Sequence, residues 1–342
     1  AVCSELEMRK EYLGGETIET IYWGGGTPSQ LDKEDFETIF YYLHKNYSIS
    51  SHPEITLEAN PDDLTPDYIA MLRTLPFNRL SMGIQTFNES ILKVLQRRHT
   101  ARQAIEAFQN CRAAGFQNIS IDLMYGLPGE TLSTWQQDLD QALLLHPEHL
   151  SAYHLIYEED TVLWKLREQH KVEEADEDLS VSLFSTLIDR LTSEGYDHYE
   201  ISNFSLPGLY SRHNSSYWTE KKYLGCGPSA HSYNGVSRQW NVASLDTYIK
   251  GISAGTPVFE IEELDLYTRY NDFVITRIRT EWGMPLSKLR DEFGEKLYDY
   301  CLRMAAPHLK QGTLELVNDI LKLTRKGIFI SDGIMSDMLW TD

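Results

Sequence analysis

Three successive glycines, residues 24–26, come directly before Thr27 in the segment YWGGGTPS. A backbone without side chains can lie very close to a bound molecule, and the threonine hydroxyl can donate or accept a hydrogen bond. Polar side chains also follow later apolar runs, at Glu58, Gln85 and Asp122. Carboxylates accept hydrogen bonds from hydroxyl and ammonium groups, and an amide both donates and accepts. This pattern predicts a pocket for a small polar ligand.

The elements that must hold these residues alternate between strand-like and helix-like patterns. Such alternation predicts parallel strands joined by right-handed crossovers, in a partial or complete barrel or a doubly wound sheet. The polar residues fall where the strands end, and in a barrel the carboxyl ends of the strands meet at one mouth. The expected strands are 20–23, 54–59, 79–84, 119–124, 149–155 and 196–201, and the helices between them are 31–46, 66–72, 90–96, 101–114, 131–145 and 178–193.

Each of these residues also has a purely structural explanation. A glycine cluster forms tight turns without any ligand, and a carboxylate or amide often caps a neighbouring helix. The recurrence of polar residues after successive strands favours a site over these separate explanations.

Composition limits the class of protein. The chain of 342 residues has 31 Lys and Arg against 51 Asp and Glu, so its net charge of -20 disfavours nucleic acid as a partner. Four cysteines are too scattered for a disulfide framework, which favours the cytoplasm. No apolar run reaches the length of a membrane span, and no secretory signal is visible. Since the chain begins with Ala1 rather than Met, we expect further residues upstream.

Several motifs together resemble the radical S-adenosylmethionine proteins of the oxygen-independent coproporphyrinogen III oxidase family. They are GGGTPS, ANPDDLT after Glu58, LSMGIQTFN, the RRH at 97–99 and IDLMYGLPGET. The resemblance covers nearly the whole chain, in order. It implies a partial (β/α)6 TIM-like barrel with an HNxxYW extension over residues 1–255, and a smaller, mainly helical, winged-helix-like domain over residues 256–342.

The resemblance also implies S-adenosylmethionine as a cofactor. In the family, an iron-sulfur cluster reduces it and releases a 5′-deoxyadenosyl radical. The glycines are expected to approach the amino and carboxylate groups of the methionine moiety, and Arg97 can pair with a carboxylate. The binding residues carried over from the family are Gly25, Gly26, Thr27, Glu58, Gln85, Arg97, Asp122 and Ile156.

One departure from the family concerns the [4Fe-4S] cluster. Its CxxxCxxC motif, whose thiolates hold three irons, should precede the glycine segment and is absent here. Cys3 is solitary and is better explained as a small buried side chain. No metal ligand is therefore assigned in this chain, and the cluster cysteines are expected upstream of Ala1.

A second motif distinguishes branches of the family. The segment RHNSSYW matches HNxxYW through His213, Asn214, Tyr217 and Trp218. It resembles the haem chaperone (HemW-like) branch, and an imidazole beside aromatic rings suits ligation and stacking of a haem. The alternative is that the histidine bonds within its loop and the tryptophan packs as core. Cys226 and His231 are further candidate ligands, although a structural role suits each better.

Three functions remain open on the sequence. The first is a haem chaperone that delivers haem to a membrane-associated acceptor protein, with a second copy of the chain as another candidate partner. The second is the oxygen-independent coproporphyrinogen III dehydrogenase, an oxidoreductase of porphyrin biosynthesis that converts propionates to vinyls. The third is a non-catalytic binding barrel without the cluster. Whether the protein is an enzyme stays undecided at this point.

Overall fold

The computed structural model describes residues 1–341, and it divides into two compact units. The barrel unit comprises Thr20–Lys33 and Glu54–Ser211. The terminal unit comprises Ala1–Glu19, Glu34–Pro53 and Arg212 to the end of the described chain. The boundary at residue 255 that the sequence predicts is not tested by this division and stays a prediction.

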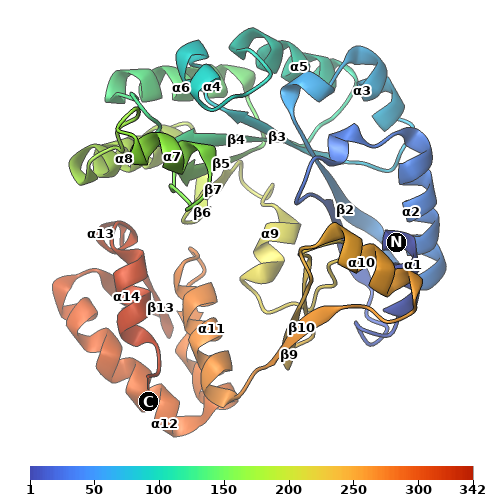
Figure 1. The fold of residues 1–342 in the computed structure, drawn as a ribbon. Helices are drawn as coiled ribbons and strands as arrows, with labels where there is room; N and C mark the ends of the chain where they lie inside the picture. Colours follow the sequence, from blue (N-terminus) through green and yellow to red (C-terminus); the bar gives the residue numbers. More distant parts are fainter. Residues whose placement is uncertain (342) are drawn as a thin grey trace. The chain divides into compact units, whose positions relative to one another are not determined.

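A curled seven-stranded sheet confirms the predicted partial barrel (Figure 1). Strands β2 to β5 pair in parallel, in their order along the chain. The last two strands depart from the simple alternation, because only two residues separate β6 from β7 and they form an antiparallel pair. β7 is inserted antiparallel beside β5, so β6 still runs in the direction of β5. The strands are β1 (Ile18–Trp23), β2 (Ile49–Ala59), β3 (Arg79–Gln85), β4 (Ile119–Tyr125), β5 (His149–His154), β6 (Asp197–Glu200) and β7 (Asn203–Ser205).

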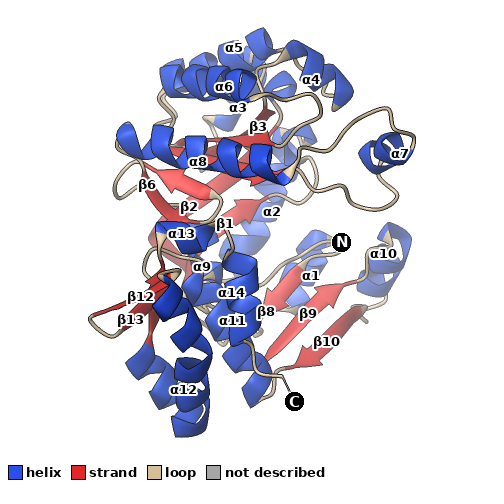
Figure 2. Ribbon diagram, turned by 90° about the vertical axis from the view of Figure 1, so that its left-hand side faces the viewer, coloured by secondary structure: helices blue, strands red, loops and turns tan. Residues whose placement is uncertain are grey.

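Helices of the barrel unit cover the outer face of the sheet (Figure 1), except for the short helix Val162–Glu168, which lies on a loop away from it (Figure 2). The sequence determines where the helix Pro66–Leu72 begins. Thr65 accepts a hydrogen bond from the Tyr68 amide at 3.2 Å, and Pro66 occupies the first helical position. The helix Ala101–Ala113 ends just before Gly115, which has a φ of 96°, as predicted. The helices are α3 (Pro66–Leu72), α4 (Glu89–Val94), α5 (Ala101–Ala113), α6 (Leu132–Leu145), α7 (Val162–Glu168) and α8 (Glu177–Ser193).

Strand β3 shows how the sequence orients the site. Leu80, Met82 and Ile84 are completely buried, as expected for the face that packs against helices. The side chains that alternate with them, Ser81 and Gln85, point to the opposite face and line a pocket. The alternation of side chains along RLSMGIQ therefore places the core residues on one face of β3 and the pocket residues on the other.

The terminal unit contains two three-stranded antiparallel sheets, in the orders β10-β9-β8 and β11-β13-β12 (Figure 2). The second sheet and its helices form the small, mainly helical C-terminal region that the sequence predicts, whereas the first sheet was not anticipated. The helices are α1 (Val2–Met8), α2 (Lys33–Asn46), α9 (Arg212–Tyr217), α10 (Leu245–Ser253), α11 (Leu266–Ile278), α12 (Leu286–Gln311), α13 (Arg325–Ile328) and α14 (Ser331–Met338). The strands are β8 (His231–Tyr233), β9 (Ser237–Asn241), β10 (Phe259–Glu263), β11 (Met284–Pro285), β12 (Leu314–Val317) and β13 (Ile320–Leu323).

A buried carboxylate on α1 organises the first of these sheets. Glu5 has no exposed surface and accepts hydrogen bonds from the Gly227 amide at 2.9 Å and from Asn241 Nδ2 and Tyr248 Oη, both at 2.7 Å. Its cationic neighbour is Arg9, whose Nη1 lies 3.2 Å from Oε1. Each acceptor oxygen is thus engaged, which removes most of the cost of burying the charge.

The hydropathy of the helices gives one further fact. Among residues 1–341, none of the helices combines the length and apolar character needed to cross a membrane.

Candidate functional site

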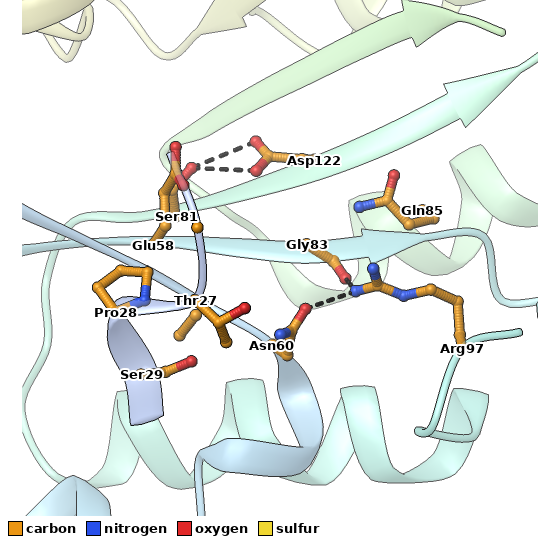
Figure 3. Close-up of a pocket in the computed structure, with 12 residues that line it drawn as sticks. Thr27, Pro28, Ser29, Glu58, Asn60, Ser81, Gly83, Gln85, Arg97 and Asp122 are labelled. Atoms are coloured by element: carbon orange, nitrogen blue, oxygen red, sulfur yellow. Dashed lines mark hydrogen bonds between the residues drawn. The ribbon is translucent and has the colours of Figure 1, made fainter. Parts of the chain in front are cut away.

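The predicted strand-end residues gather around one pocket of about 210 Å³ in the barrel unit (Figure 3). They come from the glycine segment after β1, the carboxyl-terminal ends of β2 and β3, the middle of β4 and the segment after α4. The lining consists of Gly26, Thr27, Pro28, Ser29, Glu58, Ala59, Asn60, Ser81, Gly83, Gln85, Arg97 and Asp122.

The three glycines have different reasons to lack side chains. A Cβ on Gly24 would lie 2.6 Å from the Tyr22 ring and 2.7 Å from the Glu58 carboxyl group, so the backbone and that carboxylate pack directly together. Gly25 has a φ of 82°, a conformation that favours glycine. Gly26 lines the pocket, and a Cβ there would meet nothing within 4 Å. Open space beside its backbone leaves room for a ligand to approach.

Glu58 is held in a fixed orientation. Tyr22 Oη donates a hydrogen bond of 2.7 Å to Oε1, and the Gly25 amide donates one of 3.2 Å to Oε2. Both carboxylate oxygens keep a second acceptor position for a ligand's donors. Gly25, which is absent from the lining, thus acts on the pocket through this contact.

Arg97 supplies positive charge. Its Nη2 donates to Asn60 Oδ1 at 2.8 Å and to the Gly83 carbonyl oxygen at 2.7 Å. Within the described part of the chain, no carboxylate lies within 4 Å of this guanidinium. Burial lowers the pKa of Arg97, but an arginine stays a cation at neutral pH. A cation held by neutral acceptors in a pocket suits an anionic ligand group.

Asp122 lies opposite, on β4. Ser81 Oγ lies 3.2 Å from each of its carboxylate oxygens (Figure 3). Burial raises the pKa of Asp122 to about 6, although hydrogen bonds from Ser151 and Ser81 and the charge of Arg79 act in the opposite direction. The group is therefore an anion at neutral pH that protonates under mildly acidic conditions.

A local irregularity aims Gln85 at the pocket. The register between β3 and β4 shifts between Gly83 and Gln85, and Gln85 has a φ of 71°. A non-glycine residue at positive φ is uncommon and often marks a functional position. A Cβ on Gly83 would come within 3.0 Å of Gln85 Nε2 and 3.4 Å of Arg97 Nη2, so this glycine leaves room for both side chains.

Asp63 holds the segments at the edge of the pocket together through hydrogen bonds. Asp63 accepts hydrogen bonds from Ser29 Oγ at 2.7 Å, from Gln30 Nε2, and from Arg98 Nη2 at 3.1 Å. These contacts tie the segment after the glycines to the turn that follows β2. The lining residue Ser29 is thereby held in place.

Most of the sequence-predicted positions meet here. Gly26, Thr27, Glu58, Gln85, Arg97 and Asp122 all line the pocket. Ile156 does not line it and is 75% exposed, so its cofactor role stays a prediction. Sequence reasoning missed Ser81 and Gly83 as lining residues, although they share the face of β3 with Gln85 and the period of two would have shown this.

The HNxxYW residues lie in the terminal unit, on and directly after the short helix α9. His213 Nε2 lies 2.9 Å from Tyr217 Oη, and the two rings meet edge to face. Trp218 is stacked by the guanidinium of Arg279, whose Cζ lies 4.1 Å from the ring centroid. Asn214 lies in the same helix and is half-buried. The segment thus joins an imidazole, two aromatic rings and a nearby cation.

The other candidate haem ligands have structural surroundings. Cys226 lies beside Glu5, and burial raises the pKa of its thiol well above the ordinary range. His231 stacks on Trp240 with ring centroids 6.1 Å apart. A thiol kept protonated is a poor iron ligand, which leaves the stronger case with His213.

The side chains that could bind a metal do not gather into a site in the described part of the chain. Among residues 1–341, no three His, Cys, Asp or Glu side chains gather as a metal site. Cys111 and Cys301 are buried, and Cys3 and Cys226 are partly buried. Burial raises the pKa of all four thiols, whereas cluster ligands are thiolates. These residues do not fit an iron-sulfur cluster.

A curled half-barrel with a pocket at its strand ends is the arrangement expected of a radical S-adenosylmethionine protein, and the comparisons with known proteins assign the chain to that class. Residues 4–142 match the Radical SAM superfamily, and residues 264–330 match the HemN C-terminal domain. The Heme chaperone HemW of Mycobacterium tuberculosis is 32% identical over 340 residues, which cover 99% of this chain and 85% of that protein. The Heme chaperone HemW of Bacillus subtilis is 30% identical, over 95% of this chain and 86% of its own length. The chain belongs to the HemW family of haem chaperones.

The fold is shared with an enzyme. Coproporphyrinogen III oxidase (HemN) from Escherichia coli, a radical SAM enzyme, aligns with a TM-score of 0.84 over 98% of this chain and 81% of its own. Its sequence is 23% identical, so the likeness is one of fold.

The radical SAM domain implies S-adenosylmethionine and a [4Fe-4S] cluster as cofactors of the family. The pocket fits the first: open space lies beside Gly26, Arg97 is a cation without a carboxylate partner among the described residues, and Asp122 offers acceptor oxygens. The donor set for the cluster is lacking in the described chain, so we derive no step through it.

Proposed function

We propose that this protein binds haem through the HNxxYW segment and delivers it to an acceptor protein. The observation that carries the proposal is the similarity to curated haem chaperones over 99% of the chain, together with the clustering of His213, Tyr217 and Trp218. The acceptor is expected to be associated with a membrane, and a homodimer is part of the same proposal.

His213 is the iron ligand in this proposal. Its Nε2 already contacts Tyr217 Oη at 2.9 Å, so ligation through that nitrogen replaces a hydrogen bond with a coordinate bond. The aromatic rings of Tyr217 and Trp218 offer apolar faces for the macrocycle. Arg279, which stacks on Trp218, offers a guanidinium for a haem propionate.

The barrel pocket is proposed to bind S-adenosylmethionine. Arg97 pairs with the carboxylate of the methionine moiety, the backbone at Gly26 and Thr27 approaches the same end, and Gln85 supplies a donor and an acceptor. Glu58 and Asp122 accept hydrogen bonds from the ammonium group or the ribose hydroxyls. When bound, this cofactor would supply a 5′-deoxyadenosyl radical, with methionine as the other product, on accepting one electron from an external reductant. The chain's own residues bind and orient it.

A haemin titration followed by absorbance tests the haem proposal. Wild-type protein is expected to show a saturable change in the haem absorption band, and His213→Ala is expected to weaken binding about tenfold or more, because the ligand bond is lost. The matched control is His44→Ala, an exposed histidine on α2 of the same unit. Equal affinity of His213→Ala and wild type would remove His213 as the ligand.

The dehydrogenase is the second candidate function, since the fold is that of coproporphyrinogen III oxidase. An anaerobic assay with coproporphyrinogen III, S-adenosylmethionine and a reductant distinguishes the two. A chaperone leaves the substrate unchanged. Stoichiometric release of carbon dioxide would favour the enzyme instead.

A further inference from the structure

Strand β10 is an exposed edge of the β8-β9-β10 sheet. It pairs only with β9 in the described chain (Figure 2). All five of its residues are exposed. Phe259 and Ile261 are 38% and 51% exposed, so the edge presents two large apolar side chains to a partner. An open edge of this kind is a template for pairing with another chain.

The hydrogen-bond pattern shows which backbone groups face outward. The Val242 amide donates to the Val258 carbonyl, and the Leu264 amide donates to the Val236 carbonyl. In an antiparallel ladder the bonded pairs alternate, so residues 258, 260, 262 and 264 bond toward β9. Phe259, Ile261 and Glu263 therefore direct their amide and carbonyl groups away from β9. None of these outward groups has a partner among residues 1–341.

The side chains of β10 carry a two-sided pattern. Phe259, Ile261 and Glu263 share one face, and Glu260 and Glu262 share the other. Three exposed carboxylates in five residues make the edge strongly acidic, within a chain of net charge -20.

The cations near this edge are already paired. Arg9 lies 5.9 Å from the Phe259 ring centroid and is bound to Glu5. Arg238 is paired with Asp272, and its contact with Glu262 is long, at 3.8 Å. Glu260 and Glu263 have no cation within 4 Å among residues 1–341, so most of the negative charge of the edge is left without an ion pair.

We propose that β10 receives an extended segment of a partner protein in which basic residues alternate with apolar ones. The outward groups of Phe259, Ile261 and Glu263 form the ladder, and the alternating side chains match the apolar and acidic faces of β10. A second copy of this chain does not suit the edge. Antiparallel self-pairing centred on Ile261 sets Glu260 against Glu262, and like charges directly opposite each other are destabilising.

Synthetic peptides test this surface apart from haem or cofactor binding. The probe is a short capped peptide that alternates lysine and valine, and its control alternates glutamate and valine. Saturating lysine peptide is expected to slow amide hydrogen exchange at Phe259, Ile261 and Glu263 by about tenfold or more. The amides of Glu260 and Glu262, already bonded to β9, should change little. Equal protection by the acidic peptide, or protection only elsewhere, overturns the proposal.

Two variants make the test specific. Ile261→Pro removes an outward amide while the β9 ladder keeps its own bonds, and proline is tolerated at such edge positions. It should abolish peptide binding. Glu260→Lys with Glu262→Lys, which changes both carboxylates of the acidic face, should reverse the preference toward the acidic peptide, whereas Glu173→Lys with Glu177→Lys, an equal charge change in the barrel unit, should not. Thermal unfolding of each variant shows whether it is folded, and a folded Ile261→Pro variant that still binds refutes the proposal.

Discussion

Replacing Glu5 with alanine is expected to loosen the β8-β9-β10 sheet. The carboxylate accepts from the Gly227 amide, Asn241 Nδ2 and Tyr248 Oη at 2.7 to 2.9 Å, and it is the ion-pair partner of Arg9. Truncation leaves these donors buried without an acceptor. Removing one partner of a buried charged network costs about 3–5 kcal/mol, and we expect about 4 kcal/mol here.

Hydrogen exchange measured by mass spectrometry on residues 223–248 checks this magnitude. A loss of about 4 kcal/mol corresponds to roughly thousandfold faster exchange of amides that open with the sheet. The matched control is Glu7→Ala on the same helix. Glu7 is half-exposed and pairs with exposed Lys45 at 2.9 Å, so its loss should leave exchange nearly unchanged.

A milder substitution, Glu5→Gln, tests the same reasoning even if Glu5→Ala impairs folding. Glu5→Gln retains one acceptor oxygen but loses the charge, and it should lie between wild type and Glu5→Ala. The reasoning is wrong if Glu5→Ala exchanges no faster over residues 223–248 than Glu7→Ala does.

Four further predictions concern the barrel pocket and the HNxxYW segment. S-adenosylmethionine binding should weaken as the pH falls through about 6, because Asp122 then protonates and loses acceptor capacity, and calorimetric titration of Asp122→Asn should show a flatter pH profile. The raised pKa of Asp122 also makes the free energy of unfolding depend on pH. Because the folded state binds the proton more tightly than the unfolded state, the contribution of Asp122 to stability falls as the pH rises from about 4 to about 6. Urea unfolding of wild type and Asp122→Asn at several pH values measures this fall. Gly83→Ala should lower cofactor affinity with little loss of stability, since its Cβ displaces only the flexible ends of Gln85 and Arg97; an unchanged dissociation constant would contradict the assigned pocket. Tyr217→Phe should tighten haem binding if His213 ligates through Nε2, because the competing hydrogen bond is removed, and weaker haemin binding would point to Tyr217 as a contact that the complex keeps.

The site was largely predictable because its residues follow a rule of position. Parallel strands bring their carboxyl ends together, so polar residues such as Glu58 and Gln85 could be expected in one place from local patterns. The pairing of Ser81 with Asp122 is a matter of register between β3 and β4, which the sequence of either strand alone does not state.

Other features depend on contacts that local patterns cannot show. The β8-β9-β10 sheet consists of strands of three to five residues, too short for a clear periodicity. From the sequence alone, Glu5 looks like an ordinary acidic residue near the start of a helix. The groups that bind its carboxylate lie 222 to 243 residues further along the chain. Sequence reasoning likewise missed that β7 inserts beside β5, since the deciding feature is a two-residue connection.

The contacts of Glu5 also constrain how the chain folds during synthesis. Helix α1 is synthesised before the partners of its carboxylate, and Tyr248, the last of them, follows Glu5 by 243 residues. At about 5–20 residues per second, the ribosome takes about 12 to 50 s to supply that partner. During this interval the barrel unit, whose segments lie between residues 20 and 211, can already fold. The terminal unit can therefore complete the contacts of Glu5 only after Tyr248 has been synthesised, whereas every segment of the barrel unit is available earlier.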